Sequence, residues 1–182
     1  MRVKRGLLLM AVGAAAMPLA AMANPDSYAA LQLSQVEYSE SGAPDLEPTA
    51  LTARLGANLS PNFGLELRVG TGLSDDSVTV GPEKLTLELD NAISAYARVM
   101  APMGERFTAY AMVGLTRSKI TAKFRDATGS FSMSDSETDL SYGVGGELLL
   151  NVNTFVSVEY ARLLDGDDYE LDALSIGIGF RF

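Results

Sequence analysis

The chain has 182 residues, which is enough for one domain with a closed core but too few for two domains of ordinary size. Its 23 acidic residues outnumber its 14 basic residues, and the net charge of −9 disfavours nucleic acid as a partner. Cysteine and histidine are both absent, which excludes disulfide bonds, thiolate chemistry and metal sites built on these two residue types.

A secretory signal peptide is expected over residues 1–23. The segment starts with basic residues, continues with an apolar stretch, and ends with the small residues Ala21 and Ala23 just before a cleavage site. A membrane-spanning helix is disfavoured, because the apolar stretch is short and Asn24, Pro25 and Asp26 follow it at once. The mature protein is therefore expected at residues 24–182, where no second apolar run is long enough for a spanning helix.

The rest of the chain alternates between apolar and polar residues with a period of two, which is typical of β-strands with one apolar face. Residues 51–59 and 63–70 are clear examples, joined by a tight turn at residues 60–62. The pattern predicts eight strands, at residues 27–38, 50–60, 63–73, 84–100, 107–120, 136–150, 155–163 and 171–182. Their connections alternate between long polar segments and tight turns, as in an antiparallel up-and-down meander.

The two faces of the predicted strands differ in the size of their side chains. Glycine and serine dominate the polar face, and Leu, Val, Ile, Phe and Tyr dominate the apolar face. The inside of an eight-stranded barrel is just wide enough to be filled by side chains, so small polar residues fit inside and bulky apolar residues belong outside. A soluble barrel would instead present Lys and Glu to water. The sequence therefore predicts an all-β fold, an eight-stranded antiparallel up-and-down transmembrane β-barrel.

Aromatic residues stand where the strands would enter the membrane interface. Phe63, Phe107 and Phe155 each come at the first position after a short turn. Aromatic girdles of transmembrane barrels lie at this level. We therefore expect these three rings on the lipid-facing surface, near the end of the barrel that carries the short turns.

The last predicted strand keeps its alternation to the end of the sequence and resembles the assembly signal of bacterial outer-membrane barrels. The residues that carry this signal are Leu174, Ile176, Ile178, Phe180 and Phe182. Residues 24–182 as a whole resemble the small eight-stranded outer-membrane family that includes the OmpA transmembrane domain, OmpX and Ail. The resemblance implies an integral outer-membrane protein of a Gram-negative bacterium, with periplasmic termini, four extracellular loops, and the barrel-assembly machinery as its partner during biogenesis.

No enzyme activity is expected. Outer-membrane barrels with known activity, among them the palmitoyltransferase, the lipid A deacylase, the phospholipase and the omptin protease, are similar in relying on a histidine base, and this chain has no histidine. No spacing of serines or carboxylates suggests another catalytic site. The acidic segment at residues 164–170 lacks the spacing of an EF-hand loop. We therefore predict no catalytic residue, no metal and no cofactor.

Six charged residues fall on the polar face at similar heights above the short turns: Arg54, Glu66, Arg68, Arg98, Glu147 and Glu159. Buried charges need partners and hydrogen bonds, so these residues are expected to form a neutral belt of salt bridges that plugs the lumen. The alternative is a narrow porin-like channel for ions or small solutes. Glu147 and Glu159 are expected nearly opposite each other, so an arginine must reach them or one carboxyl must be protonated.

Four basic residues continue the lipid-facing side of the fifth predicted strand beyond the expected membrane boundary: Arg117, Lys119, Lys123 and Arg125. At this height they would meet the phosphates or core sugars of lipopolysaccharide, whereas the alternative is a solvated loop face. A hairpin turn is expected at residues 126–129, so the fifth and sixth strands would protrude above the membrane. The expected partners are outer-membrane lipids and lipopolysaccharide, and host or phage surfaces reached through the loops.

Overall fold

The computed structural model describes residues 26–40, 48–74, 76–80, 83–125, 130–165 and 169–182. The expected signal peptide and the expected turn at residues 126–129 lie outside these ranges. Within them, no helix is long and apolar enough to cross a membrane. The strands of the described ranges are β1 (Ser27–Glu40), β2 (Thr49–Ser60), β3 (Phe63–Ser74), β4 (Asp76–Val80), β5 (Glu83–Met103), β6 (Phe107–Arg125), β7 (Ser130–Leu149), β8 (Thr154–Asp165) and β9 (Tyr169–Arg181).

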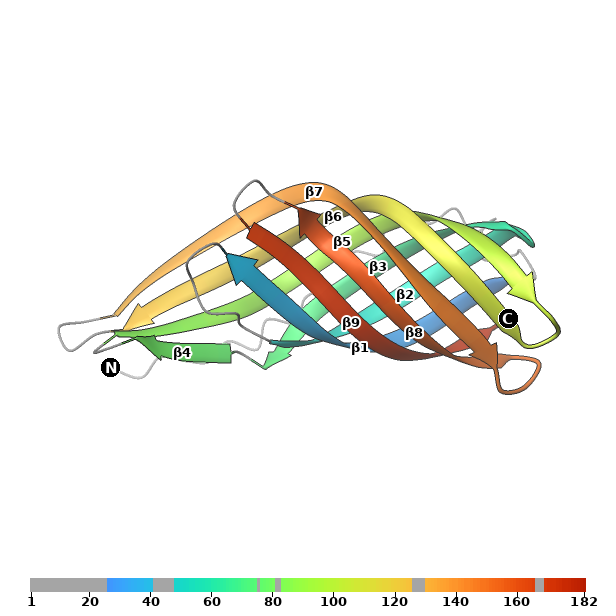
Figure 1. Cartoon of the computed structure of the whole chain (residues 1–182), viewed down its shortest axis with the longest axis horizontal. Helices are drawn as coiled ribbons and strands as arrows, with labels where there is room; N and C mark the ends of the chain where they lie inside the picture. The colour runs from blue at the N-terminus through green and yellow to red at the C-terminus, as the bar shows by residue number, and fades with distance from the viewer. Residues whose placement is uncertain (1–25, 41–47, 75, 81–82, 126–129, 166–168) are drawn as a thin grey trace.

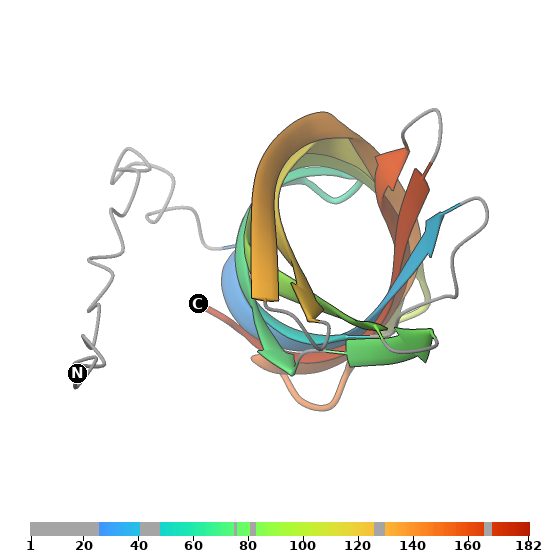
Figure 2. The same cartoon turned by 90° about the vertical axis from the view of Figure 1, so that its left-hand side faces the viewer.

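Antiparallel pairing closes the sheet into a barrel. The closing ladder joins β1 to β9, from the pair Tyr28↔Arg181 to the pair Glu40↔Tyr169. On the other side of the sheet β3 pairs directly with β5, and the short strand β4 pairs with the upper part of β5. Eight strands therefore form the ring that Figure 2 shows end-on, and β4 is an addition at its rim. The predicted eight-stranded antiparallel barrel is confirmed.

The strands on one side of the barrel are longer than the sequence pattern predicted. The β6–β7 ladder continues without interruption from Phe107↔Leu148 to Arg125↔Ser130, so most of the loop predicted at residues 121–135 is strand. The loop predicted before the fourth strand likewise contains β4. Both strand-end predictions were wrong because the contrast between apolar and polar residues fades in these segments, whereas backbone pairing does not depend on it. The expected protrusion of the fifth and sixth predicted strands agrees with the long β6–β7 ladder. Figure 1 shows β4, β5, β6 and β7 projecting together beyond the other strands.

The outer surface of the barrel is apolar. In β9, Leu174, Ile176, Ile178 and Phe180 are all more than half exposed, whereas Ser175 between them is 3% exposed. The same alternation runs through β2 and β3. A closed sheet satisfies the backbone of every strand, and hydrocarbon can then cover the apolar outer face.

One of the three predicted girdle residues lies on the opposite face. Phe63 and Phe107 are 40% and 41% exposed on the outer surface, but Phe155 is fully buried inside the barrel. Its ring packs edge-on against Tyr28, with the ring centroids 5.5 Å apart. The prediction was wrong for Phe155 because it was based only on the place of this residue after a short turn. Phe155 is two residues before the buried Ser157, and alternation along β8 places both inside.

Aromatic rings inside the barrel lie over glycines of the neighbouring strands. A Cβ atom added to any of four glycines would collide with a ring on the residue directly across the ladder. These pairs are Tyr28↔Gly56, Tyr96↔Gly114, Tyr110↔Gly145 and Phe155↔Gly179. The inner glycines therefore provide the space in which the aromatic side chains lie flat against the wall of the lumen.

Candidate functional site

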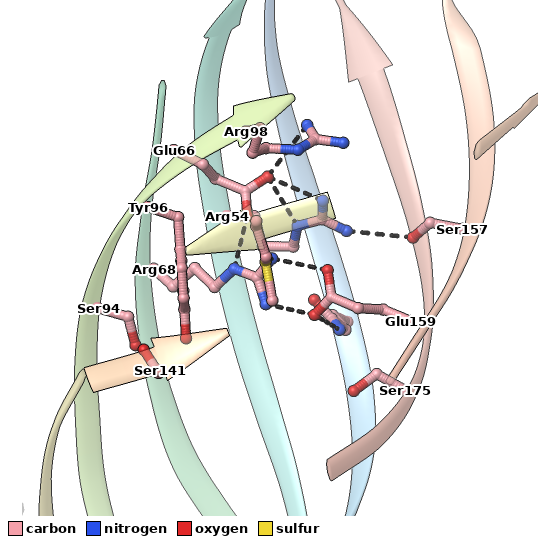
Figure 3. Close-up of polar contacts among 12 residues, drawn as sticks. Arg54, Glu66, Arg68, Ser94, Tyr96, Arg98, Ser141, Ser157, Glu159 and Ser175 are labelled. Carbon is pink, nitrogen blue, oxygen red and sulfur yellow. Dashed lines mark hydrogen bonds and ion pairs between the residues drawn. The ribbon is translucent and has the colours of Figure 1, made fainter. Parts of the chain in front are cut away.

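The six predicted lumen residues come from five strands and are buried inside the barrel. Figure 3 shows five of them lying close together: Arg54, Glu66, Arg68, Arg98 and Glu159. Each is at most 6% exposed. Alternation along the strands sends all six side chains to the inner face, where the small neighbours in β3, Gly64 and Gly70, leave room for them. The lumen is too narrow for water to solvate isolated charges, so every charged group there needs a protein partner.

Glu66 is the centre of this network. Its carboxylate accepts hydrogen bonds from Arg54, with Nη2 and Oε2 2.8 Å apart, and from Arg68, with Nε and Oε1 2.5 Å apart. Arg98 lies 3.5 Å from the same carboxylate, and the Tyr28 hydroxyl also donates to it. Three guanidinium groups and a phenol thus surround one carboxylate.

Glu159 is held by a single arginine from the opposite wall. Arg68 contacts both carboxylate oxygens, with Nη1–Oε1 and Nη2–Oε2 distances of 2.5 Å and 2.7 Å. Tyr110 donates to Oε2 at 2.7 Å and Gln32 to Oε1 at 3.2 Å. Because Arg68 also bonds Glu66, its guanidinium bridges β3 and β8 across the lumen.

Glu147 is bound by different arginines from those of Glu159. Arg98 Nη2 lies 2.5 Å from its Oε1, and Arg181 Nη2 lies 3.1 Å from its Oε2. The register pairs Glu147 with Ser157 instead of with Glu159, so the two carboxylates are offset by two residues along the ladder. An arginine therefore reaches each carboxylate, which is the first of the two arrangements that the sequence analysis expected.

The sequence interpretation missed Arg181 and the lumen tyrosines. Arg181 is on the inner parity of β9, but that strand was interpreted only through its outer, apolar residues. Its charge makes the group four arginines against three glutamates, so the belt is not neutral as expected.

Arg98 stacks 4.0 Å from the centroid of the Tyr110 ring, and Arg68 lies 4.6 Å from that of Tyr96. Alternation along β5 and β6 could have identified both tyrosines as inner residues.

Hydroxyl groups fill the lumen above the ionic network. Thr116 bonds Ser94 and Ser141 at 2.9 Å and 2.8 Å, and Ser175 donates to Ser34 at 2.9 Å. A cavity of about 40 Å³ remains between these layers, which is room for one or two water molecules. A buried apolar cluster follows nearer the mouth, consisting of Val36, Ala50, Leu171 and Ala173.

The four predicted lipopolysaccharide contacts lie along β6, and the structure describes the side chains of two of them, Arg117 and Lys119. Arg117 is exposed, whereas Lys119 forms an ion pair with Asp90, at an Nζ–Oδ2 distance of 3.1 Å. The side chains of Lys123 and Arg125 lie outside the described part of the structure, although their backbones pair with Ser132 and Ser130 of β7.

A second charged group at the upper ends of β8 and β9 was not predicted. Arg162 and Asp172 form two hydrogen bonds, of 2.9 Å and 3.1 Å, and Tyr160 donates to Asp172 at 2.9 Å. Arg162 and Asp172 are register partners. Their pairing depends on the register between β8 and β9, which the sequence pattern does not give.

A closed sheet of eight antiparallel strands, apolar outside and packed with paired charges inside, defines an outer-membrane β-barrel. The family model for the outer membrane protein beta-barrel domain matches residues 6–182. The chain belongs to this family and is an integral protein of the bacterial outer membrane. A search of curated protein sequences finds no match to it.

Solved structures share the fold at low sequence identity. Ail of Yersinia pestis is 18% identical, with a TM-score of 0.65 over 87% of this chain and 99% of that one. The N-terminal barrel of Pseudomonas aeruginosa OprF is 17% identical, with a TM-score of 0.55 over 84% and 97%. Neisserial surface protein A is 14% identical, with a TM-score of 0.58 over 86% and 97%. Ail was also solved in complex with the heparin analogue sucrose octasulfate.

Proposed function

We propose that this protein is a closed outer-membrane barrel that acts through its extracellular part, in a structural or surface-interaction role and without enzyme activity. The observation that supports a closed lumen is the bridging arginine, Arg68, whose guanidinium bonds Glu66 on one wall and Glu159 on the other. A permeating ion would have to separate these buried pairs, and breaking a buried ion pair is costly. The cavity above the network is small, about 40 Å³, and Arg68 and Glu159 are among the residues that line it.

The alternative function is a narrow porin-like channel for ions or small solutes, and conductance decides between the two. We would compare the refolded protein in planar bilayers with Arg68→Ala and with Arg117→Ala, whose side chain lies on β6 near the extracellular rim. Closed wild-type and Arg117→Ala barrels with a conducting Arg68→Ala variant are the expected result. Steady channels in the wild type would contradict the proposal and support the porin-like alternative.

We further propose that Arg117, Lys119, Lys123 and Arg125 contact lipopolysaccharide. The support is their common parity along β6 and the exposure of Arg117, because basic side chains near the membrane surface attract anionic headgroups. Replacing all four by Gln is expected to weaken lipopolysaccharide binding at least tenfold, while Arg106→Gln, in a short turn, leaves it unchanged. Equal binding by the fourfold variant and the wild type would remove this proposal.

Host or phage surface partners are the other class that the extracellular part could meet. Ail was crystallised with a heparin analogue, so heparin is a suitable second polyanion for the same fourfold variant.

The chain ends belong to the periplasmic side in this proposal: the Phe182 amide donates to the Ser27 carbonyl at 2.9 Å, close to the short turns. N-terminal sequencing of the exported protein would test cleavage after residue 23.

A further inference from the structure

The lumen changes from apolar to ionic in steps along β1. From the mouth toward the short turns, the inner side chains of this strand follow in the order Val36, Ser34 and Gln32. Ser34 accepts a hydrogen bond from Ser175 of β9. Gln32 donates to Glu159, which belongs to the ionic network. An apolar level therefore lies above a level of hydroxyl groups, and the hydroxyl groups lie above the charges.

The apolar level extends over four neighbouring strands. Val36 pairs in register with Ala173 of β9, and Leu171 is the next inner residue of β9 toward the mouth. Ala50 of β2 belongs to the same buried cluster, and Leu163 of β8 packs against it. We call the four buried residues of this cluster, Val36, Ala50, Leu171 and Ala173, the apolar cap.

The apolar cap is shielded from water although it lies near the mouth of the barrel. Each of its four residues is at most 4% exposed, whereas side chains around a water-filled funnel would be exposed to the lumen. The cavity of about 40 Å³ is lined by Val36, Ala50 and Ala173, and also by Ala92 and Thr116 of the opposite wall. The two walls therefore approach each other closely at this level, with room between them for one or two water molecules.

We propose that the apolar cap is a second closure of the lumen, which keeps water and ions of the extracellular side away from the ionic network. An ion in an apolar constriction loses its hydration and gains no polar partner, so such constrictions exclude ions. The cap acts in series with the network and shares no residue with it. The inference deepens the closed lumen of the proposed function and rests on it.

A closure at this level also protects the network from salt in the extracellular solution. Salt screens charges that water reaches, but it screens buried pairs much less. Arg68 and Glu159 are 6% and 2% exposed, and the cap and the hydroxyl level lie between them and the mouth. The cap contains no charged group, so salt does not weaken the cap itself.

Access to a thiol placed between the cap and the network gives the first test. The chain has no cysteine, so a single introduced cysteine is the only thiol. Ser175→Cys adds one just below Ala173 of the cap, and Asp135→Cys adds one at an exposed position in the projecting part of β7. The full chain, refolded in phosphatidylcholine nanodiscs, is treated with a charged methanethiosulfonate, and mass spectrometry follows the reaction. We expect Ser175→Cys to react at least a hundredfold more slowly than Asp135→Cys. Similar rates would overturn the proposal.

Opening the cap separates its effect from that of burial in general. In the Ser175→Cys background, Leu171→Ala shortens a cap residue. Leu174→Ala is the matched control, because Leu174 is 57% exposed on the outer face of the same strand. Val36→Thr is a second cap variant, which keeps the shape of the side chain and adds a hydroxyl group. Folded barrels are identified by their heat-modifiable gel mobility before labelling. We expect each cap variant to raise the reaction rate at least tenfold and the control to change it less than twofold. If the cap variants react no faster than the control, the proposal fails.

Conductance in planar bilayers tests the cap in series with the network. Arg68→Ala is expected to open the network, so the cap is then the remaining constriction. We expect Arg68→Ala combined with Val36→Thr to carry at least threefold more current than Arg68→Ala combined with Val113→Thr. The latter is the same change on the outer face, where Val113 is 50% exposed. Equal currents would contradict the proposal. Channels in the wild type would contradict the proposed function instead, whereas the reaction of Ser175→Cys judges the cap whatever the network does.

Discussion

Glu66 shows how much the lumen depends on individual charged residues. A buried carboxylate loses its hydration, and three arginines and Tyr28 replace that hydration here. Alternation predicts the inner face for Glu66 and the other five charged residues, and all six are buried. Which arginine meets which glutamate depends on the stagger and width of the closed barrel, and these are not properties of any one strand.

Glu66→Gln is expected to destabilise the barrel, because it leaves the surrounding guanidinium groups without their shared charge. Removing one partner of a buried ionic network costs about 3–5 kcal/mol. Urea unfolding in lipid vesicles, followed by tyrosine fluorescence, measures the change. Glu105→Gln is the control, since Glu105 is exposed in a short turn, and it should change the free energy of unfolding by less than about 0.5 kcal/mol. Equal stability of the two variants would contradict the central role of Glu66.

At the scale of strands, the sequence pattern is informative where the two faces differ and uninformative where they do not. The boundaries of β2 and β3 are predicted within one residue, because apolar and polar positions alternate clearly through them. The upper part of β7 alternates serine with acidic residues, so hydropathy does not separate its faces. The pairing of rings with glycines across neighbouring strands also escapes a strand-by-strand interpretation, because it requires the register.

Gly56→Ala tests one ring and glycine pair. The added methyl group would overlap the Tyr28 ring, and moving that ring disturbs its hydrogen bonds with Glu66 and Arg98. Overpacking of this kind costs about 1–3 kcal/mol. In a Tyr28→Ala background the same substitution is expected to be neutral or stabilising, since alanine is otherwise favoured over glycine in a strand. Urea unfolding of all four proteins gives the coupling, and purely additive effects would contradict the contact.

The whole molecule was the most predictable level. A chain of alternating strands with a bulky apolar face can satisfy both hydrocarbon and its own backbone only by closing, and this requirement determines the architecture without knowledge of any side-chain contact. The same requirement makes the outer face intolerant of charge, to a degree that depends on depth in the membrane.

Ile176→Arg is expected to destabilise the folded protein in lipid by about 2–4 kcal/mol, the cost of a basic residue near the middle of the bilayer. Ile176 is 61% exposed on the outer face of β9, between register partners on β1 and β8. Val152→Arg is the matched control, because Val152 is 88% exposed in a short turn. Unfolding in vesicles measures both variants, and a similar loss in each would argue against lipid at Ile176.

The bridging position of Arg68 has a consequence for the order of folding. Its partner Glu159 lies 91 positions away in the sequence, so their contact needs strands from both halves of the chain. Contacts between distant segments form slowly, because a long loop must be closed first. Until the first and last strands meet, water still reaches the charged groups and Arg68 lacks its partner Glu159. The ring therefore has to close and dehydrate in one concerted, late step, and a chain stalled before that step exposes an ionic interior to the surrounding lipid.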